Sequence, residues 1–272
     1  KLTKKPQVAK LVMAGFDSVR DCANTVAEII KIGVIPAGLE MMDQFAIEAS
    51  EAFAQAGYPL GAKALLLCEL DGSEDLVKED LNKVINILSK ASSVRVSENE
   101  EERLLFWKGR KSAFPAVGRL SPDYYCMDGT IPKRYLADVL EKISSLSATY
   151  DLRVANVFHA GDGNLHPLIL YDAAQPGELE KAEDFGNDIL KLCVDMGGSI
   201  TGEHGVGIEK LDAMCHQYNS SELEIFHQIK AVFDPHSLLN PGKAVPTLHR
   251  CAELGNMHVH NGNLPHPELE RF

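Results

Sequence analysis

The stretch RVANVFHAGDGNLHPLILY, residues 153–171, joins two apolar runs through Asp162 and Gly163. Asp-Gly between apolar runs is among the strongest short-range signals for a β-hairpin, because a two-residue type I′ turn needs positive φ at both central positions. If Asp162 and Gly163 occupy those positions, His159 lies directly opposite His166 on one face of the sheet. Directly paired Cβ atoms are about 4.5 to 5.5 Å apart, so two imidazoles there can share a metal ion. The stretch therefore predicts a hairpin whose open end carries either a metal site or merely two polar residues.

Upstream of this hairpin, short apolar runs alternate with patterns typical of amphipathic helices. Strands are expected at residues 8–16, 37–42, 62–70 and 93–97, with helices at 18–32, 42–56 and 77–91. This β-α-β-β-α-β order with short turns indicates a ferredoxin-like antiparallel sheet with helices on one face. A second unit of the same order can be drawn through residues 122–202, although no repeat in the sequence accompanies it.

Downstream of residue 202, the pattern becomes helical and then irregular. Residues 208–215 and 221–232 predict helices, so we expect an α+β fold with a helical C-terminal subregion. After Pro235 the chain loses its periodicity and is rich in Pro, Gly, His and Asn. We expect residues 1–243 to form one domain and residues 244–272 an extended tail that lies against another surface.

Composition excludes several classes of protein. The 272 residues are 45% hydrophobic and 24% charged, which suits a globular domain with a buried core. A net charge of −12 with scattered Lys and Arg argues against a nucleic-acid partner. The six cysteines include no C-x-x-C pair, which favours a reducing, cytoplasmic compartment. No stretch reaches the roughly 18 to 20 apolar residues of a membrane span, although peripheral contact with the inner face of a membrane is compatible with the sequence.

The segment GEHGVG, residues 202–207, is the second feature that could carry chemistry. Glu203 would add an oxygen ligand to His159 and His166, giving a His-His-Glu set with open positions that is typical of catalytic metal sites. Neighbours on an extended strand point to opposite faces, so Glu203 and His204 can serve one site only if the chain bends at the glycines. The alternative is a glycine-rich turn between a strand and a helix.

Other candidates are less specific. Arg110, near the end of a helix expected at residues 99–116, could bind a carboxylate through two hydrogen bonds, although such a residue is commonly part of a solvated helix end. The tail contains residues that suggest a second metal site but match no defined spacing: His249, Cys251, His258, His260 and His266. The sequence has no G-x-G-x-x-G dinucleotide fingerprint and no G-x-S-x-G nucleophile elbow.

Several motifs in order resemble those of a known family. They are HAGDGNLH at residues 159–166, GEHGVG at 202–207, FDP at 233–235 and LNPGK at 239–243. Together they look like the C-terminal domain of FAD-linked oxidases. The endings LHRCAE at 248–253, MHVH at 257–260 and PELERF at 267–272 resemble most the bacterial glycolate oxidase D-type subunit.

The resemblance implies a flavoprotein in which an N-terminal domain, expected to be absent from this chain, binds FAD, while this part caps the flavin and holds the substrate. By position, His159, His166 and Glu203 would ligate zinc or manganese, and His204 would act as general base. Arg110 would bind the substrate carboxylate and Asn164 would line the same pocket, whereas residues that bind the flavin stay unassigned. Some relatives that act on larger diacids carry a lysine in the strand that here spans residues 124–128, where this chain has Cys126. This difference favours a small 2-hydroxy acid such as glycolate or D-lactate.

Two functions from other classes remain open at this point. One is a metal-dependent hydrolase that uses the same His-His-Glu ion without flavin. The other is a non-catalytic module whose tail docks a partner subunit, for which an iron–sulfur protein is a candidate.

Overall fold

The computed structural model describes residues 5–246. The chain divides into two compact units, one that ends at Gly202 and one that begins at Glu203. Each unit is described by itself.

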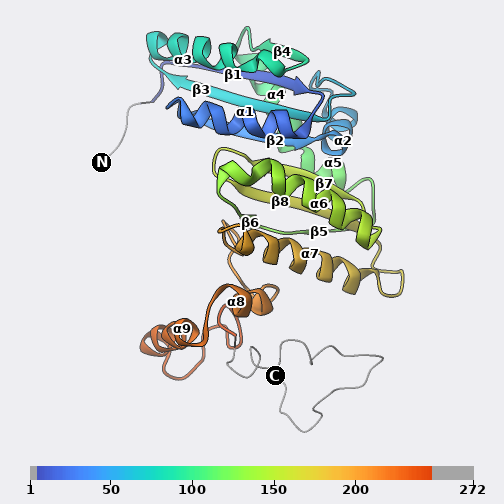
Figure 1. The fold of residues 1–272 in the computed structure, drawn as a ribbon, viewed down its shortest axis with the longest axis vertical. Coiled ribbons are helices and arrows are strands. Elements are labelled where there is room, and N and C mark those ends of the chain that lie inside the picture. The colour runs from blue at the N-terminus through green and yellow to red at the C-terminus, as the bar shows by residue number, and fades with distance from the viewer. Residues whose placement is uncertain (1–4, 247–272) are drawn as a thin grey trace. The chain divides into compact units, whose positions relative to one another are not determined.

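The first unit is built on one eight-stranded sheet (Figure 1). Its path runs β4-β1-β3-β2-β7-β8-β5, with β6 also paired to β8, and every named pair is antiparallel. The strands are β1 (Val8–Phe16), β2 (Gly38–Asp43), β3 (Ala64–Gly72), β4 (Ser93–Val96), β5 (Asp123–Cys126), β6 (Gly129–Thr130), β7 (Val154–His159) and β8 (Asn164–Tyr171). The α+β fold with an antiparallel sheet is therefore confirmed.

The two predicted β-α-β-β-α-β units join through a single strand pair. Met41 of β2 lies opposite Phe158 of β7, and Met42 lies opposite Val157. This pairing joins the edge strands of the two units and leaves no open edge between them.

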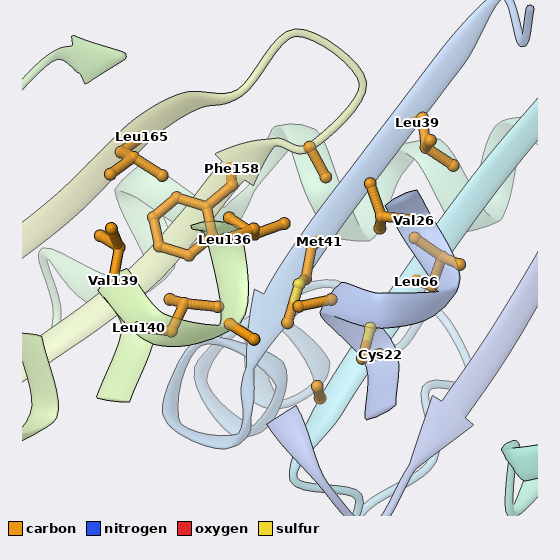
Figure 2. Close-up of a cluster of buried hydrophobic side chains, with 14 of the residues drawn as sticks. Cys22, Val26, Leu39, Met41, Leu66, Leu136, Val139, Leu140, Phe158 and Leu165 are labelled. Atoms are coloured by element: carbon orange, nitrogen blue, oxygen red, sulfur yellow. The ribbon is translucent and has the colours of Figure 1, made fainter. Parts of the chain in front are cut away.

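Four long helices cover one face of the sheet (Figure 1). They are α1 (Val19–Lys31), α3 (Glu74–Ile87), α6 (Leu136–Tyr150) and α7 (Glu178–Asp195), with short 3₁₀ turns at Leu88–Lys90 and Lys133–Tyr135. Figure 2 shows Phe158 of β7 among Leu136, Val139 and Leu140 of α6, within the larger buried apolar cluster. Burial of such side chains from water is the main favourable contribution to the stability of this layer.

The opposite face carries a second, smaller helix layer, although helices were expected on one face only. It consists of α2 (Gln44–Ala54), α4 (Glu100–Lys111) and α5 (Ala113–Val117). Leu65 and Leu67 of β3 point to this face, while Leu66 between them points to the larger cluster. Strands that are covered on both sides read as continuous apolar runs, which is the pattern of ALLLC at the start of β3.

The second unit, described over residues 203–246, contains α8 (Leu211–Gln217) and α9 (Ser220–Phe233). Asn219 and Glu222 form a capping box at the start of α9. The expected tail from residue 247 onward, with its cluster of histidines and Cys251, lies outside the described residues. Among residues 5–246, no helix has both the length and the apolar character that crossing a membrane requires.

Candidate functional site

The hairpin between β7 and β8 forms, but its turn differs from the expected one. His159 pairs with Asn164, so the loop contains the four residues 160–163. The backbone N–H groups of Asp162 and Gly163 both donate to the His159 carbonyl, and of these two residues Gly163 alone has positive φ. The expected two-residue type I′ turn is therefore wrong.

Contacts with distant segments explain the longer loop. The Gly161 N–H donates to the Leu39 carbonyl at 2.9 Å, and the Gly163 carbonyl accepts from the Ile131 N–H at 2.9 Å. Lys133 Nζ also donates to the Gly161 carbonyl at 2.8 Å. These hydrogen bonds satisfy backbone groups of the four-residue loop. The tertiary contacts therefore override the local preference of Asp-Gly for a two-residue turn.

The change of register still leaves both histidines on one face of the sheet. His166 lies opposite Val157, and His159 lies opposite Asn164. Relative to the expected pairing, each partner has moved by two residues, and side chains alternate between faces with a period of two. The two imidazoles are consequently diagonal neighbours, with ring centroids 5.2 Å apart and ring planes perpendicular.

The two histidines differ in exposure. The His166 residue is 3% exposed, and its ring has an edge contact with Phe114 at 6.3 Å between centroids. The His159 side chain is 34% exposed, because it ends β7 next to the loop. His166 is therefore fixed by packing, whereas His159 faces a more open region.

Glu40 holds His159 from the neighbouring strand. The β2–β7 pairing that sets Met41 opposite Phe158 brings Glu40 opposite His159. Glu40 Oε1 lies 2.8 Å from His159 Nδ1, and Glu40 Oε2 lies 2.7 Å from Nη2 and 3.0 Å from Nε of Arg110. Both Glu40 and Arg110 are buried. Arg110, expected to bind substrate, is thus first of all the partner of a buried carboxylate.

Asp128 holds the segment that leads toward Glu203. This fully buried carboxylate accepts from Thr201 Oγ1 at 2.7 Å and from the Gly202 N–H at 3.1 Å. Asp128 Oδ1 also lies 4.0 Å from His166 Nε2. A Cβ at position 202 would meet Asn164 Oδ1 at 2.7 Å, so only glycine fits beside the buried Asn164 side chain.

Among the described residues, one set of side chains has ligand atoms close enough to share a metal ion. It consists of His159, His166 and Glu203, whose candidate atoms all lie within 4.8 Å of one another. His204 follows in the second unit, and no role is assigned to it from geometry.

Glu40, Asp128 and Lys133 belong to this site and were missed from the sequence. Glu40 did carry a signal, because it is a single acid inside the apolar strand GLEMMD, and a charge there needs a buried partner. Lys133 and Glu40 line a cleft of about 450 Å³ together with His159, Asp162 and an apolar wall from Ile30 to Leu39.

The chain belongs to the family of FAD-linked oxidases, C-terminal domain. The model of that family matches residues 5–244.

Curated proteins with similar sequences include glycolate oxidase subunits and a D-lactate dehydrogenase. The chain is 62% identical to the glycolate oxidase subunit GlcD of Escherichia coli K12, over 100% of this chain and 55% of the relative. It is 37% identical to GlcD of Bacillus subtilis, over 89% and 52%, and 29% identical to a mitochondrial D-lactate dehydrogenase (cytochrome) of Arabidopsis thaliana, over 92% and 44%. The chain thus spans about half the length of the curated relatives it matches.

Solved structures support the fold alone. The 4-ethylphenol oxidase from Gulosibacter chungangensis matches with a TM-score of 0.67 at 14% identity, over 92% of this chain and 56% of that one. The p-cresol methylhydroxylase matches with a TM-score of 0.67 at 15% identity, over 91% and 54%.

Proposed function

We propose that this chain is the substrate-binding and metal-carrying part of a FAD-dependent 2-hydroxy-acid dehydrogenase of the glycolate oxidase type, which oxidises glycolate or D-lactate to the 2-oxo acid. The observation that carries the proposal is the pair of imidazoles on one face of β7 and β8, in a chain 62% identical to a glycolate oxidase subunit. The full activity also needs a flavin-binding part.

The donor set suits a divalent ion, zinc or manganese. Two imidazole nitrogens and a carboxylate oxygen leave coordination positions open, as catalytic rather than structural metal sites do. Glu40 beside His159 supports this assignment, because metal-binding histidines commonly donate their second ring N–H to a carboxylate. When bound, the ion would hold oxygens of the 2-hydroxy acid and lower the pKa of its hydroxyl group.

The remaining roles fall to the chain's own side chains. Arg110 donates from Nε to Glu40 and places Nη2 beside the same oxygen, and its guanidinium has further N–H groups that could bind a substrate carboxylate. Asn164 lies beside His159 in the hairpin and would line the same pocket. His204 would take the proton of the substrate hydroxyl as the hydride leaves C2, and FAD would supply the acceptor for that hydride.

The pocket favours a small acid. Cys126 of β5 lies on the face that also carries Leu168 and His166, and it brings no positive charge for a second carboxylate. We therefore favour glycolate and D-lactate over diacids.

Partners and location follow from this function. The FAD-binding domain is the first partner, and an iron–sulfur protein would be a suitable acceptor for electrons from the reduced flavin. We place the protein in the cytoplasm, with peripheral contact at the inner face of a membrane.

The test joins these residues to the N-terminal part of E. coli GlcD and assays glycolate and D-lactate with a dye acceptor. We expect turnover of one or both acids, and a fall in kcat of about 10² to 10⁴ for His204→Ala with KM little changed. His236→Ala, which removes an exposed imidazole of the same unit, serves as the matched control. A flavin-loaded wild type that oxidises neither acid would refute the function, and unchanged turnover of His204→Ala would refute the base.

A further inference from the structure

The buried Glu40 carboxylate is shared between a histidine and an arginine. Its Oε1 atom faces His159 Nδ1 at 2.8 Å, while its Oε2 atom accepts a hydrogen bond from Arg110 Nε at 3.0 Å and lies 2.7 Å from Arg110 Nη2 in an ion pair. The Glu40 and Arg110 residues are 8% and 7% exposed, so solvent screens these interactions little. The three side chains come from β2, β7 and α4, which are far apart in the sequence.

This arrangement determines which nitrogen of His159 can bind a ligand. An ionised carboxylate only accepts hydrogen bonds, so the hydrogen of the neutral imidazole must sit on Nδ1. The lone pair is then on Nε2, on the far side of the ring from Glu40. Arg110 supports the same arrangement, because its Nε donates to Glu40 Oε2 at 3.0 Å and its Nη2 lies 2.7 Å from the same oxygen, which holds the carboxylate in place.

We propose that Glu40 is the positioning residue of the metal centre: it fixes the tautomer and ring orientation of His159, and Arg110 fixes Glu40. The inference rests on the proposed function, because it assumes that His159 and His166 bind a divalent ion. It adds a role for Glu40 and makes Arg110 part of the metal support as well as a candidate for substrate binding.

His159 needs such a partner more than His166 does. The His166 ring is buried and packed against Phe114, on a strand that pairs with β5, β6 and β7. The His159 side chain is a third exposed and is the last residue of its strand, so packing restrains its ring less. The contact with Glu40 restrains this ring from the neighbouring strand β2.

The test measures binding of Zn²⁺ and Mn²⁺ by calorimetry in the protein joined to its flavin-binding part. Glu40→Gln keeps the shape of the side chain, removes its charge and allows either ring nitrogen of His159 to carry the hydrogen. We expect the metal affinity to fall about 10- to 100-fold, the usual effect of losing such a partner.

Glu69→Gln is the matched control. Glu69 lies on the adjacent strand β3, on the same face of the sheet, and its Oε2 accepts from Arg103 at 2.6 Å and from Trp107 Nε1. The substitution also breaks a carboxylate–arginine pair, but over residues 5–246 the Glu69 side chain has no hydrogen bond or ion pair with a histidine. We expect its metal affinity to stay within about twofold of wild type, because the proposed effect requires a carboxylate next to an imidazole.

A spectroscopic readout separates positioning from simple destabilisation. In ¹⁵N-histidine-labelled protein without metal, we expect His159 to show the tautomer with hydrogen on Nδ1 in wild type and in Glu69→Gln, and a mixture in Glu40→Gln. If Glu40→Gln does not fold, the double variant Glu40→Met, Arg110→Met replaces the ion pair by apolar side chains of similar size, which buried pairs commonly tolerate. It should fold and still bind metal 10- to 100-fold more weakly than wild type.

The outcomes are distinguishable. Wild-type metal affinity in Glu40→Gln or in the double variant refutes the role of Glu40 and leaves the proposed function standing. A wild type that binds neither Zn²⁺ nor Mn²⁺ refutes the ion set itself, and with it this inference.

Discussion

Gly163 is the residue on which the geometry of the histidine hairpin depends most directly. Its φ is +75°, and a Cβ there would lie 2.2 Å from the Ile131 carbonyl oxygen, a backbone atom that cannot move aside cheaply. We expect Gly163→Ala to reduce the free energy of unfolding by about 3 kcal/mol, because left-handed backbone strain and a steric clash add together. Chemical denaturation measures this change, and metal titration should show weaker binding because His159 and His166 flank the loop.

Gly177 provides the control for that substitution. Its φ is +83°, but a Cβ there would meet no atom within 4 Å. Gly177→Ala should therefore cost only the strain of the left-handed conformation, about 1 to 2 kcal/mol, and leave metal binding unchanged. Equal losses of stability in the two variants would show that the loop accommodates the methyl group.

Asp43 at the end of β2 should make stability depend on pH. Its carboxylate accepts from the Ala46 N–H and from both the backbone N–H and Nδ2 of Asn156, yet burial raises its pKa from 3.8 to about 6. Because the folded-state pKa lies above the unfolded one, the contribution of Asp43 to stability is fully present below about pH 4. It is lost as the pH rises through about 6.

The measurement compares wild type with Asp43→Asn, which cannot titrate at this position. The stability of wild type relative to the variant should fall by up to about 3 kcal/mol between pH 4 and pH 7. The readout is the change of this stability difference with pH. Its value at a single pH is not informative, because the variant also changes the hydrogen bonds to Ala46 and Asn156. A difference that is constant over this range would mean that Asp43 is charged throughout.

At the scale of elements, the sequence pattern predicts the bounds of those strands and helices that depend on local interactions. The first strand was expected at residues 8–16 and spans Val8–Phe16, and the helix expected from residue 18 has Ser18 as its N-cap. The turn at 160–163 was not predictable in the same way, since its partners Leu39 and Ile131 come from other parts of the chain. For the same reason the apolar strand around Glu40 signalled a buried partner without identifying Arg110 or His159.

In helix α4, helix propensity and packing predict opposite effects of Gly109→Ala on the stability of the protein. Alanine normally stabilises a helix interior by about 1 kcal/mol relative to glycine. A Cβ at Gly109, however, would lie 2.4 Å from the ring of Tyr58, which is buried and donates its hydroxyl to the Phe106 carbonyl. We therefore expect Gly109→Ala to destabilise the protein by about 1 to 3 kcal/mol in thermal or chemical denaturation.

Tyr58→Ala removes the obstacle and so serves as the reference background. In that background, Gly109→Ala should be neutral or stabilising, as propensity alone predicts. Since Arg110 follows Gly109 directly, the single variant should also weaken metal binding if Arg110 positions Glu40. A stabilising effect of Gly109→Ala in the wild-type background would contradict the close packing of α4 on Tyr58.

At the scale of the whole first unit, the candidate site lies at the seam between the two halves of the sheet. Glu40 comes from β2 in the first half, and His159 and His166 come from β7 and β8 in the second half. Each half can be predicted from its own pattern of strands and helices. Their joining through Met41 and Phe158 cannot, because it depends on two edge strands more than a hundred residues apart. The sequence motifs thus predicted that the two histidines lie close together, whereas the contacts of Glu40 and Asp128 with them depend on the assembled sheet.

A metal ion at this seam should stabilise the protein as a whole, because it binds the folded state, in which the ligands are already close together, and not the unfolded chain. At a metal concentration about 100 times Kd, the gain is about 2.7 kcal/mol, which corresponds to a rise in Tm of roughly 5 to 10 °C for a protein of this size. Differential scanning calorimetry with Zn²⁺ or Mn²⁺, and again after a chelator, measures this rise and its reversal. His166→Ala should abolish the rise, whereas His236→Ala, which removes an exposed histidine outside the set, should retain it. If His166→Ala were stabilised by metal as much as wild type, the ion would bind elsewhere, and the ligand set of His159, His166 and Glu203 would have to be abandoned.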